Sequence, residues 1–451
     1  MRYILPYLIS FFIGCLLLRI IFYKDKEIPS GFFFFLSTGI GLGITAHITF
    51  YSYVLFDGLN RGFILLVHIL LLLLLILINL PSLEMRKISF SQWKTKNLKE
   101  LSIIILLAIA FIPLWIQANF YPFGGWDAWS CWNLKAKFLF LEGHDWKNMF
   151  SPILWRSSPH YPLLLPLLNV WGWILLKDPT YVIPLLNSII FTLLTMGLLF
   201  CGLKIFTKSL PSILGVLLVL TLPFFTKLAT SQYSDIVVAY FLLGGLLCLV
   251  LAYRRNKKSF LLLAGLFLGF LGFTKGEGMI ATIILTLIVL FYFVSLRKRR
   301  NHIPKDFIFY FFAGLFLASW PTVLFQLLYA PANQTFINGF VSSTHPSNFY
   351  RLKIIMSFFL IEIINIKWNG IWILLLIGLS LAKERCFKKE AKIFFLFLIF
   401  YLPVVFFYYF LNTYFDIEWW LSVTLNRILF SLLPVVIFWT FYSLWETKDS
   451  G

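Results

Sequence analysis

The sequence carries little charge for its length. Only 13% of its 451 residues are Asp, Glu, Lys or Arg, whereas 60% are apolar. Soluble domains carry about 25% charged residues, so this chain cannot cover a water-exposed surface and a soluble enzyme is excluded. Intrinsic disorder is excluded too, because disordered segments have low hydrophobicity. The mean hydropathy of +0.87 indicates a multi-spanning membrane protein, with room for about a dozen apolar helices.

Acidic residues and cysteines are also scarce. The 19 acidic residues stand against 38 Lys and Arg, which gives a net charge of +19. Membrane proteins retain Lys and Arg in their cytoplasmic loops, so this excess does not indicate a nucleic-acid partner. The five cysteines have no paired spacing, and three lie within apolar runs. Neither a disulfide framework nor a zinc site is expected.

Four short basic segments orient the chain in the membrane: residues 86–99, 254–258, 297–300 and 383–392. The positive-inside rule places all four in the cytoplasm. The apolar stretch 162–176 then lies between segments that are both outside, and its length of about 15 residues is short for a crossing. We therefore expect a helix that lies on or dips into the outer leaflet.

The same alternation predicts an all-α integral membrane protein with about 13 transmembrane helices and residue 1 outside. Residues 1–100 hold three spans and a basic cytoplasmic loop. Residues 101–330 form a seven-span module with an outside loop at 119–181, and residues 331–451 hold a second outside loop and the last spans. There, only one of 354–366 and 370–382 can cross, and the second is favoured because Glu362 interrupts the first.

Ionisable side chains collect on the predicted outer side. Such residues are costly in a membrane and are therefore candidates for function. Six separate segments contribute them, which a purely structural bundle would not need. The segments carry Asp127 with Lys135, His160 with Tyr161, Asp235, Lys275 with Glu277, His345, and Arg427.

Structural alternatives exist for the acidic residues. Asp127 follows two glycines and precedes helix formers, so it is a possible N-cap. Asp235 begins an inward helix, where the helix dipole favours a carboxylate. Lys275 and Glu277 are close enough in sequence to pair with each other.

The basic and aromatic residues have alternatives as well. Lys135 is long enough to reach a lipid headgroup. Arg427, at the amino-terminal end of the predicted span 425–444, opposes the helix dipole and so suggests an anionic partner. Trp126, Trp129 and Trp132 recur every three residues, which favours an interfacial aromatic anchor over a sugar-stacking platform.

The combination of charges suggests a substrate class. Carboxylates deprotonate hydroxyl groups, while Lys and Arg hold phosphate, Arg through a bidentate fork. A sugar attached to a lipid phosphate meets both needs, because it offers hydroxyls, an anionic leaving group and a tail that lies between helices.

Several motifs resemble a known family. Residues 125–129 read GWDAW, which resembles the acidic loop motif of the GT-C membrane glycosyltransferases. The bacterial branch with protein-O-mannosyltransferase-like and aminoarabinose-transferase-like enzymes is most similar. Residues 160–166, HYPLLLP, resemble the juxtamembrane helix of that branch, and 231–235, SQYSD, and 275–278, KGEG, resemble later elements. The segment 425–429, LNRIL, resembles its carboxy-terminal part, so the resemblance covers about 101–330 and the last span.

The resemblance implies a GT-C-like fold and an inverting transfer. A sugar would pass from a polyprenyl-phosphate-linked donor to a glycan, lipid or protein acceptor outside the cytoplasm. The location would be a bacterial inner (cytoplasmic) membrane, with the active site facing the periplasm or exterior. By analogy, Asp127 would be the general base. Donor-phosphate binding would fall to Lys275 and Arg427, assisted by Lys135, and positioning of sugar or acceptor to Asp235, Glu277, His160 and Tyr161.

Two departures from the family pattern affect these expectations. Three spans precede the module, whereas the acidic loop usually follows the first span. One Asp stands in the loop motif in place of an adjacent acidic pair, which argues against a divalent metal, and no cofactor is expected. The alternative functions are a flippase or transporter, or a polymerase, of lipid-linked glycans. A transporter usually shows an inverted pair of broken spans, which this sequence lacks.

Overall fold

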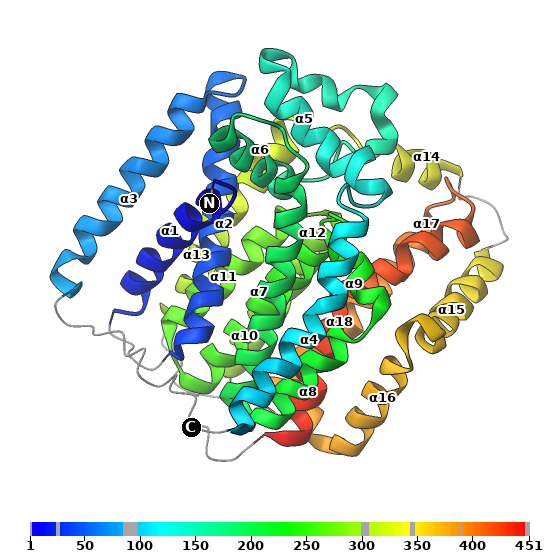
Figure 1. Cartoon of the computed structure of the whole chain (residues 1–451). Helices are drawn as coiled ribbons and strands as arrows, with labels where there is room; N and C mark the ends of the chain where they lie inside the picture. The colour runs from blue at the N-terminus through cyan, green and yellow to red at the C-terminus, as the bar shows by residue number, and fades with distance from the viewer. Residues whose placement is uncertain are drawn as a thin grey trace.

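The computed structural model is a bundle of helices (Figure 1). It describes residues 2–23, 28–83, 98–298, 306–342, 348–387 and 389–446. Within these residues there is no strand, which confirms the predicted all-α class. Residues 86–97, 299–300 and 388 of the predicted basic segments, and His345, lie outside the described residues.

Eight of the described helices are long and apolar enough to cross a membrane. A ninth is obtained if α8 (Ser209–Leu220) and α9 (Pro223–Thr230) count as one span, bent by 72°. The bend falls where Pro223 begins α9, since proline disfavours a helical conformation in the residue before it. The eight are α2 (Ser30–Phe56), α3 (Arg61–Leu83), α7 (Val182–Phe206), α10 (Asp235–Arg255), α12 (Gly276–Lys298), α13 (Asp306–Leu328), α17 (Lys392–Leu411) and α18 (Ile417–Trp445).

Shorter apolar helices accompany these candidate spans: α1 (Leu5–Ile21), α4 (Leu98–Phe120), α6 (Leu164–Leu176) and α11 (Lys258–Gly272). The count of 13 crossings therefore stays a prediction. Helix α6 has 13 residues, about 20 Å at 1.5 Å per residue, which is short of a bilayer core of about 30 Å. It lies with α5 (Asn133–Leu141) and α14 (Gln334–Ser342) at one end of the bundle, at the top of Figure 1.

Glu362 lies inside α15 (Asn348–Ile364), and the helix continues through it. Which of 354–366 and 370–382 crosses the membrane stays a prediction. The Glu362 carboxylate accepts a hydrogen bond from Trp368 Nε1 at 2.8 Å and pairs with Lys367 at 2.7 Å, so its charge is compensated locally. Helix α16 (Ile371–Ala382) follows after a short turn, and Figure 1 shows α15 and α16 one after the other along the same side of the bundle.

Glycines allow the central helices α11 and α13 to approach each other closely. A Cβ added to Gly265 of α11 would lie 2.2 Å from Phe311 O of α13, and one added to Gly314 of α13 would lie 2.1 Å from Leu262 O. Such close backbone contact is typical of membrane helix packing. Helix α10 is buried over most of its length. This packing fixes the starts of α10 and α12, where three of the candidate site residues lie.

The three amino-terminal helices pack against the rest of the bundle. Trp171 of α6 donates from Nε1 to Pro6 O at 3.1 Å, and Tyr7 of α1 donates its hydroxyl to Ile183 O at 3.3 Å. Helices α1 and α2 approach closely, since a Cβ at Gly41 would lie 1.7 Å from Ser10 O. The proposed division at residues 100 and 330 stays a prediction.

Candidate functional site

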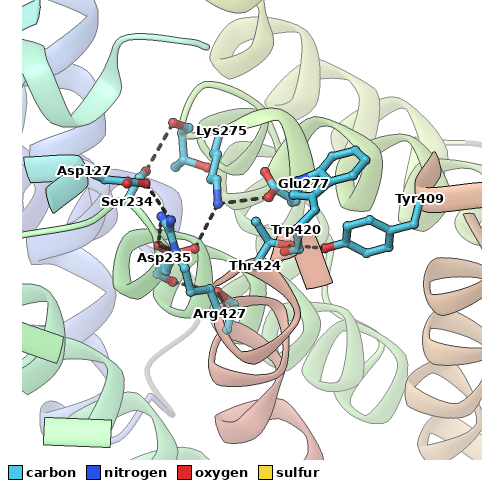
Figure 2. A network of polar contacts seen from close by, with 11 residues as sticks. Asp127, Ser234, Asp235, Lys275, Glu277, Tyr409, Trp420, Thr424 and Arg427 are labelled. Atoms are coloured by element: carbon cyan, nitrogen blue, oxygen red, sulfur yellow. Dashed lines mark hydrogen bonds and ion pairs between the residues drawn. The ribbon is translucent and has the colours of Figure 1, made fainter. Parts of the chain in front are cut away.

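Five charged side chains form a chain of alternating sign, which we call the ionic network (Figure 2). They come from four segments: the turn before α5, the start of α10, the start of α12 and the middle of α18. In order of contact, the members are Asp127, Arg427, Asp235, Lys275 and Glu277.

Arg427 bridges two carboxylates. Its Nη1 donates to Asp127 Oδ2 at 2.5 Å, while Nε and Nη2 both donate to Asp235 Oδ2, at 3.0 and 2.7 Å. The guanidinium carbon lies 4.5 Å from the ring centroid of Tyr233, a cation–π distance. The planar fork of arginine therefore joins two segments that are 108 residues apart at Asp127 and Asp235.

Lys275 extends the network to Glu277. Its Nζ lies 3.0 Å from Asp235 Oδ1 and 2.9 Å from Glu277 Oε1. Burial by itself lowers the pKa of Lys275, but the carboxylates of Asp235 and Glu277 outweigh it and raise this pKa. The ammonium is therefore charged at neutral pH. The pairing of Lys275 with Glu277, which is one of the structural alternatives, is present.

Exposure divides the network into a buried centre and open ends. The Asp235 side chain is 5% exposed and has one cation on each oxygen, whereas Asp127 is 32% exposed and Glu277 23%. Glu277 Oε2 has no hydrogen-bond partner among the described residues. Asp127 and Glu277 are therefore the more exposed carboxylates of the network, and Asp235 contacts both cations.

A tight turn before α10 brings Asp127 to Asp235. Gln232 has a positive φ of 60° and donates from Nε2 to Pro122 O at 2.7 Å. Gly125 N donates to Ser231 O at 3.0 Å, and a Cβ on Gly125 would lie 2.3 Å from the Tyr233 hydroxyl oxygen. Because glycine has no side chain, the two loops can meet here. This explains why position 125, two residues before Asp127, is a glycine.

Amide side chains continue this contact into α6 and α7. Asn133 Nδ2 donates to Gln232 Oε1 at 2.8 Å, Asn169 Nδ2 donates to Asn133 Oδ1 at 3.0 Å, and Asn187 Nδ2 donates to Asn169 Oδ1 at 2.7 Å. Sequence reasoning missed this relay. The sequence offered one signal, which is that the three asparagines stand among mainly apolar residues. It could not show that they contact one another, because they are far apart along the chain.

The expected position of Arg427 is wrong. Helix α18 begins at Ile417, and Asp416 caps it by accepting from Trp419 N at 2.8 Å. Arg427 is therefore almost three turns inside the helix, beyond the first turn in which the dipole acts. Carboxylates, and not the helix end, account for its charge.

The expectations for Asp127 and the tryptophans also need correction. Asp127 makes no side-chain capping hydrogen bond, so it is not an N-cap. Residues 128–132 form a π-helical turn, which changes the spacing of side chains around the axis. Trp126 and Trp129 are exposed, but Trp132 is fully buried and stacks on Tyr161 at 5.9 Å between ring centroids.

Lys135 is not a snorkelling residue. It is completely buried, and its Nζ donates to Ser158 O at 2.7 Å and Tyr161 O at 3.4 Å. Burial lowers the pKa of Lys135. Its contacts hold the segment that carries His160 and Tyr161, while its assistance to a donor phosphate stays a prediction.

Tyr161 lies next to the ionic network, and the ring of His160 packs against the ring of Tyr161. The Lys275 ammonium is 5.9 Å from the Tyr161 ring centroid, and the His160 ring is 4.7 Å from the Tyr161 ring. Burial and the nearby Lys135 charge lower the pKa of His160 to about 4, so this imidazole is neutral at pH 7. No three His, Cys, Asp or Glu side chains in the described part of the chain are grouped to hold a metal ion.

Comparison with known proteins gives one family. Residues 166–325 match the model of the dolichyl-phosphate-mannose-protein mannosyltransferase family. The match covers well under half of the chain and includes Asp235, Lys275 and Glu277, but neither Asp127 nor Arg427. No curated protein matches the chain. No solved structure matches it either. The similarity points to a membrane glycosyltransferase and supports no finer branch.

Proposed function

We propose that this chain is a membrane glycosyltransferase that moves a sugar from a polyprenyl-phosphate-linked donor to an acceptor outside the cytoplasm, with inversion. The observation that carries the proposal is the ionic network at one end of a helical bundle. Three of its members lie inside the segment that is similar to mannosyltransferases. The bacterial protein-O-mannosyltransferase-like or aminoarabinose-transferase-like branch is the proposed relative.

In this reaction Asp127 removes the proton from the acceptor hydroxyl. The resulting oxygen attacks the anomeric carbon of the sugar from the face opposite the phosphate. The bond from that carbon to the phosphate oxygen breaks, and its electron pair leaves with the polyprenyl phosphate. The exposure of the Asp127 carboxylate suits a general base that must reach an acceptor.

Arg427 and Lys275 are proposed to hold the donor phosphate. Arginine pairs with phosphate through two parallel N–H donors, and lysine acts as a point charge. In the present structure both cations are already paired with carboxylates. The phosphate therefore has to take the place of one carboxylate, and Asp127 is the most exposed of the three.

A flippase or transporter is less well supported. It requires charged side chains along a path through the membrane. Residues 236–252 of α10, the buried helix below Asp235, carry no charge. The polar side chains that the sequence singled out gather at one end instead, as a transfer reaction at one membrane face requires.

The test is mass spectrometry of cell-envelope glycans from cells with and without this protein. The proposal expects one glycan, lipid or protein to lose the mass of one sugar, together with accumulation of the lipid-linked donor outside the cytoplasm. Unchanged sugar composition with lipid-linked glycans retained on the cytoplasmic side would instead indicate a flippase.

A further inference from the structure

A cavity with one buried carboxylate lies at the end of the bundle away from the ionic network. The cavity, of about 210 Å³, opens between the last turns of α10 and neighbouring parts of α11, α12, α13 and α17. Tyr253, which lines it, is 18 residues from Asp235 along α10, or roughly 27 Å at 1.5 Å per residue. The cavity is thus separate from the proposed active site.

The walls of the cavity are apolar and lie at the surface of the bundle. Leu249, Ile288 and Val289 are among its lining residues. On the same helices, Phe291 of α12 and Phe309 of α13 are 74% and 68% exposed. Because these outward faces meet lipid in a membrane, an acyl chain can enter the cavity from the bilayer without crossing a polar barrier.

Glu390 supplies an unusual polar group to this apolar cavity. Its side chain is 1% exposed, and Oε1 accepts hydrogen bonds from Arg254 at 2.8 Å and from the Tyr442 hydroxyl at 2.6 Å. Oε2 has no partner among the described residues. Burial raises the pKa of Glu390, but hydrogen bonds from Tyr442 and Arg254 outweigh it and keep this pKa below its usual value. The free oxygen is therefore a charged acceptor that needs a donor.

Basic residues surround the polar end of the cavity. Lys392 lines it and is exposed. Arg255 ends α10, Lys257 lies in the turn and Lys258 begins α11. These residues flank Asn256, which also lines the cavity. Clusters of Lys and Arg at this position between membrane helices attract anionic lipid headgroups.

We propose that this cavity binds one phospholipid. Its acyl chain fills the apolar part, and its phosphate lies against Lys392 and the basic residues beside Asn256. A hydroxyl or ammonium of its headgroup donates a hydrogen bond to Glu390 Oε2. Charge and chemistry together select this occupant, because a purely apolar ligand leaves the carboxylate oxygen without a hydrogen-bond donor. The proposal does not depend on the glycosyltransferase function.

Native mass spectrometry of the full chain tests the headgroup requirement. The delipidated protein is titrated with phosphatidylglycerol, phosphatidylethanolamine or phosphatidylcholine of the same chain length. Retention of the first two and loss of the third is expected, since a choline headgroup has no N–H or O–H donor. Retention of phosphatidylglycerol alone identifies a hydroxyl donor and retention of phosphatidylethanolamine alone an ammonium donor, and either supports the proposal. Equal retention of all three lipids overturns it.

Variants test the location. Val289→Trp fills the cavity and should weaken binding roughly tenfold or more, given the free energy of burying several methylenes. The matched control is Leu287→Trp, on the exposed side of the same helix. Lys392→Gln should weaken binding about fivefold, the effect of one lipid-facing charge, whereas Lys383→Gln, which is exposed and outside the cavity, should not.

A measurement on the unaltered protein covers the case in which Val289→Trp does not fold. Phosphatidylglycerol with a diazirine in its acyl chain is bound and photolysed, and the labelled peptides are mapped. The proposal expects label on the segments of α12 and α13 that line the cavity, at 288–293 and 307–311. Label spread evenly over the exposed helices, or unchanged binding in a folded Val289→Trp variant, overturns it.

Discussion

Arg427 holds together the two carboxylates that matter most to the proposed reaction. Its contact with Asp127 at 2.5 Å occupies one carboxylate oxygen, Oδ2. We expect this oxygen to become available to the acceptor hydroxyl only when Arg427 acquires another anion. The donor phosphate is that anion in the proposed mechanism, which makes base activation depend on donor binding.

Asp127→Asn should abolish most of the transfer while leaving the folded protein in the membrane. The amide keeps the shape of the side chain but cannot accept the proton, and loss of a general base typically costs about 10²–10⁴ in rate. Arg427 keeps its partner Asp235 in this variant. Transfer rate with purified donor lipid is the measurement, and Asp145→Asn, an exposed residue of the same segment, is the control. A rate close to the unaltered protein would remove Asp127 from catalysis.

The same variant should bind the donor lipid more tightly. If carboxylate and phosphate compete for Arg427 Nη1, removing the carboxylate charge should raise donor affinity about fivefold, the effect of roughly 1 kcal/mol for a partly exposed ion pair. Donor binding is measured without acceptor, so that no turnover occurs. Lower donor affinity in Asp127→Asn contradicts competition at Arg427.

Arg427→Gln should lower both stability and donor affinity. It leaves buried Asp235 with Lys275 alone, and removing one partner from a buried pair costs roughly 3–5 kcal/mol. Lys147→Gln is the control, since Lys147 pairs with Asp57 on the surface, where an ion pair contributes about 0–1 kcal/mol. Thermal melting and donor binding are measured on both variants. A lower melting temperature with unchanged donor affinity would show that Arg427 is structural only.

The turn before α10 is the element that positions the site. Gln232 connects Pro122, beside the Asp127 loop, to Asn133 of α5, and it does so in a left-handed conformation. Gln232→Ala removes both hydrogen bonds and should displace Asp127 relative to Asp235. Since a shift of about 1 Å can cost about 10² in rate, we expect the transfer rate to fall 10- to 100-fold while donor affinity changes little.

The control for this element is Asn119→Ala, because Asn119 is exposed and its side chain donates to Trp115 O of its own helix. Its transfer rate should stay unchanged. If Gln232→Ala lowers donor affinity as much as rate, the turn acts on the donor site and not on the position of Asp127.

Local patterns in the sequence predicted some elements well and others poorly. The start of α10 at Asp235 and the pairing of Lys275 with Glu277 depend on neighbouring residues, and both are present. The position of Arg427 within α18 was missed, because hydropathy marks where a span is apolar and not where its helix begins. The π-helical turn at 128–132 and the contact of Gln232 with Asn133 were missed as well. They depend on how distant segments pack, which no local period encodes.

Two ionic clusters lie at opposite ends of α10, and the helix between them is uncharged. Asp235 at the start of α10 belongs to the ionic network, and Arg254 near its end pairs with Glu390 and Glu446. Residues 236–252, which lie between them, are buried and uncharged. Ion pairs therefore hold α10 at both of its ends.

The orientation of this arrangement is the last prediction. The basic segments place residues 119–181 outside, with α6 as a helix that does not cross, so Asp145 and Asp178 should face the same side and Lys257 the opposite side. All three positions are exposed and suit single cysteines in a Cys-free background. A membrane-impermeant maleimide added to intact cells should label positions 145 and 178 but not 257, which reacts only after the membrane is opened. Positions 145 and 178 that react from opposite sides would mean that α6 crosses. The ionic network would then have no single outside loop above it, and transfer to an acceptor outside the cytoplasm would lose its structural basis.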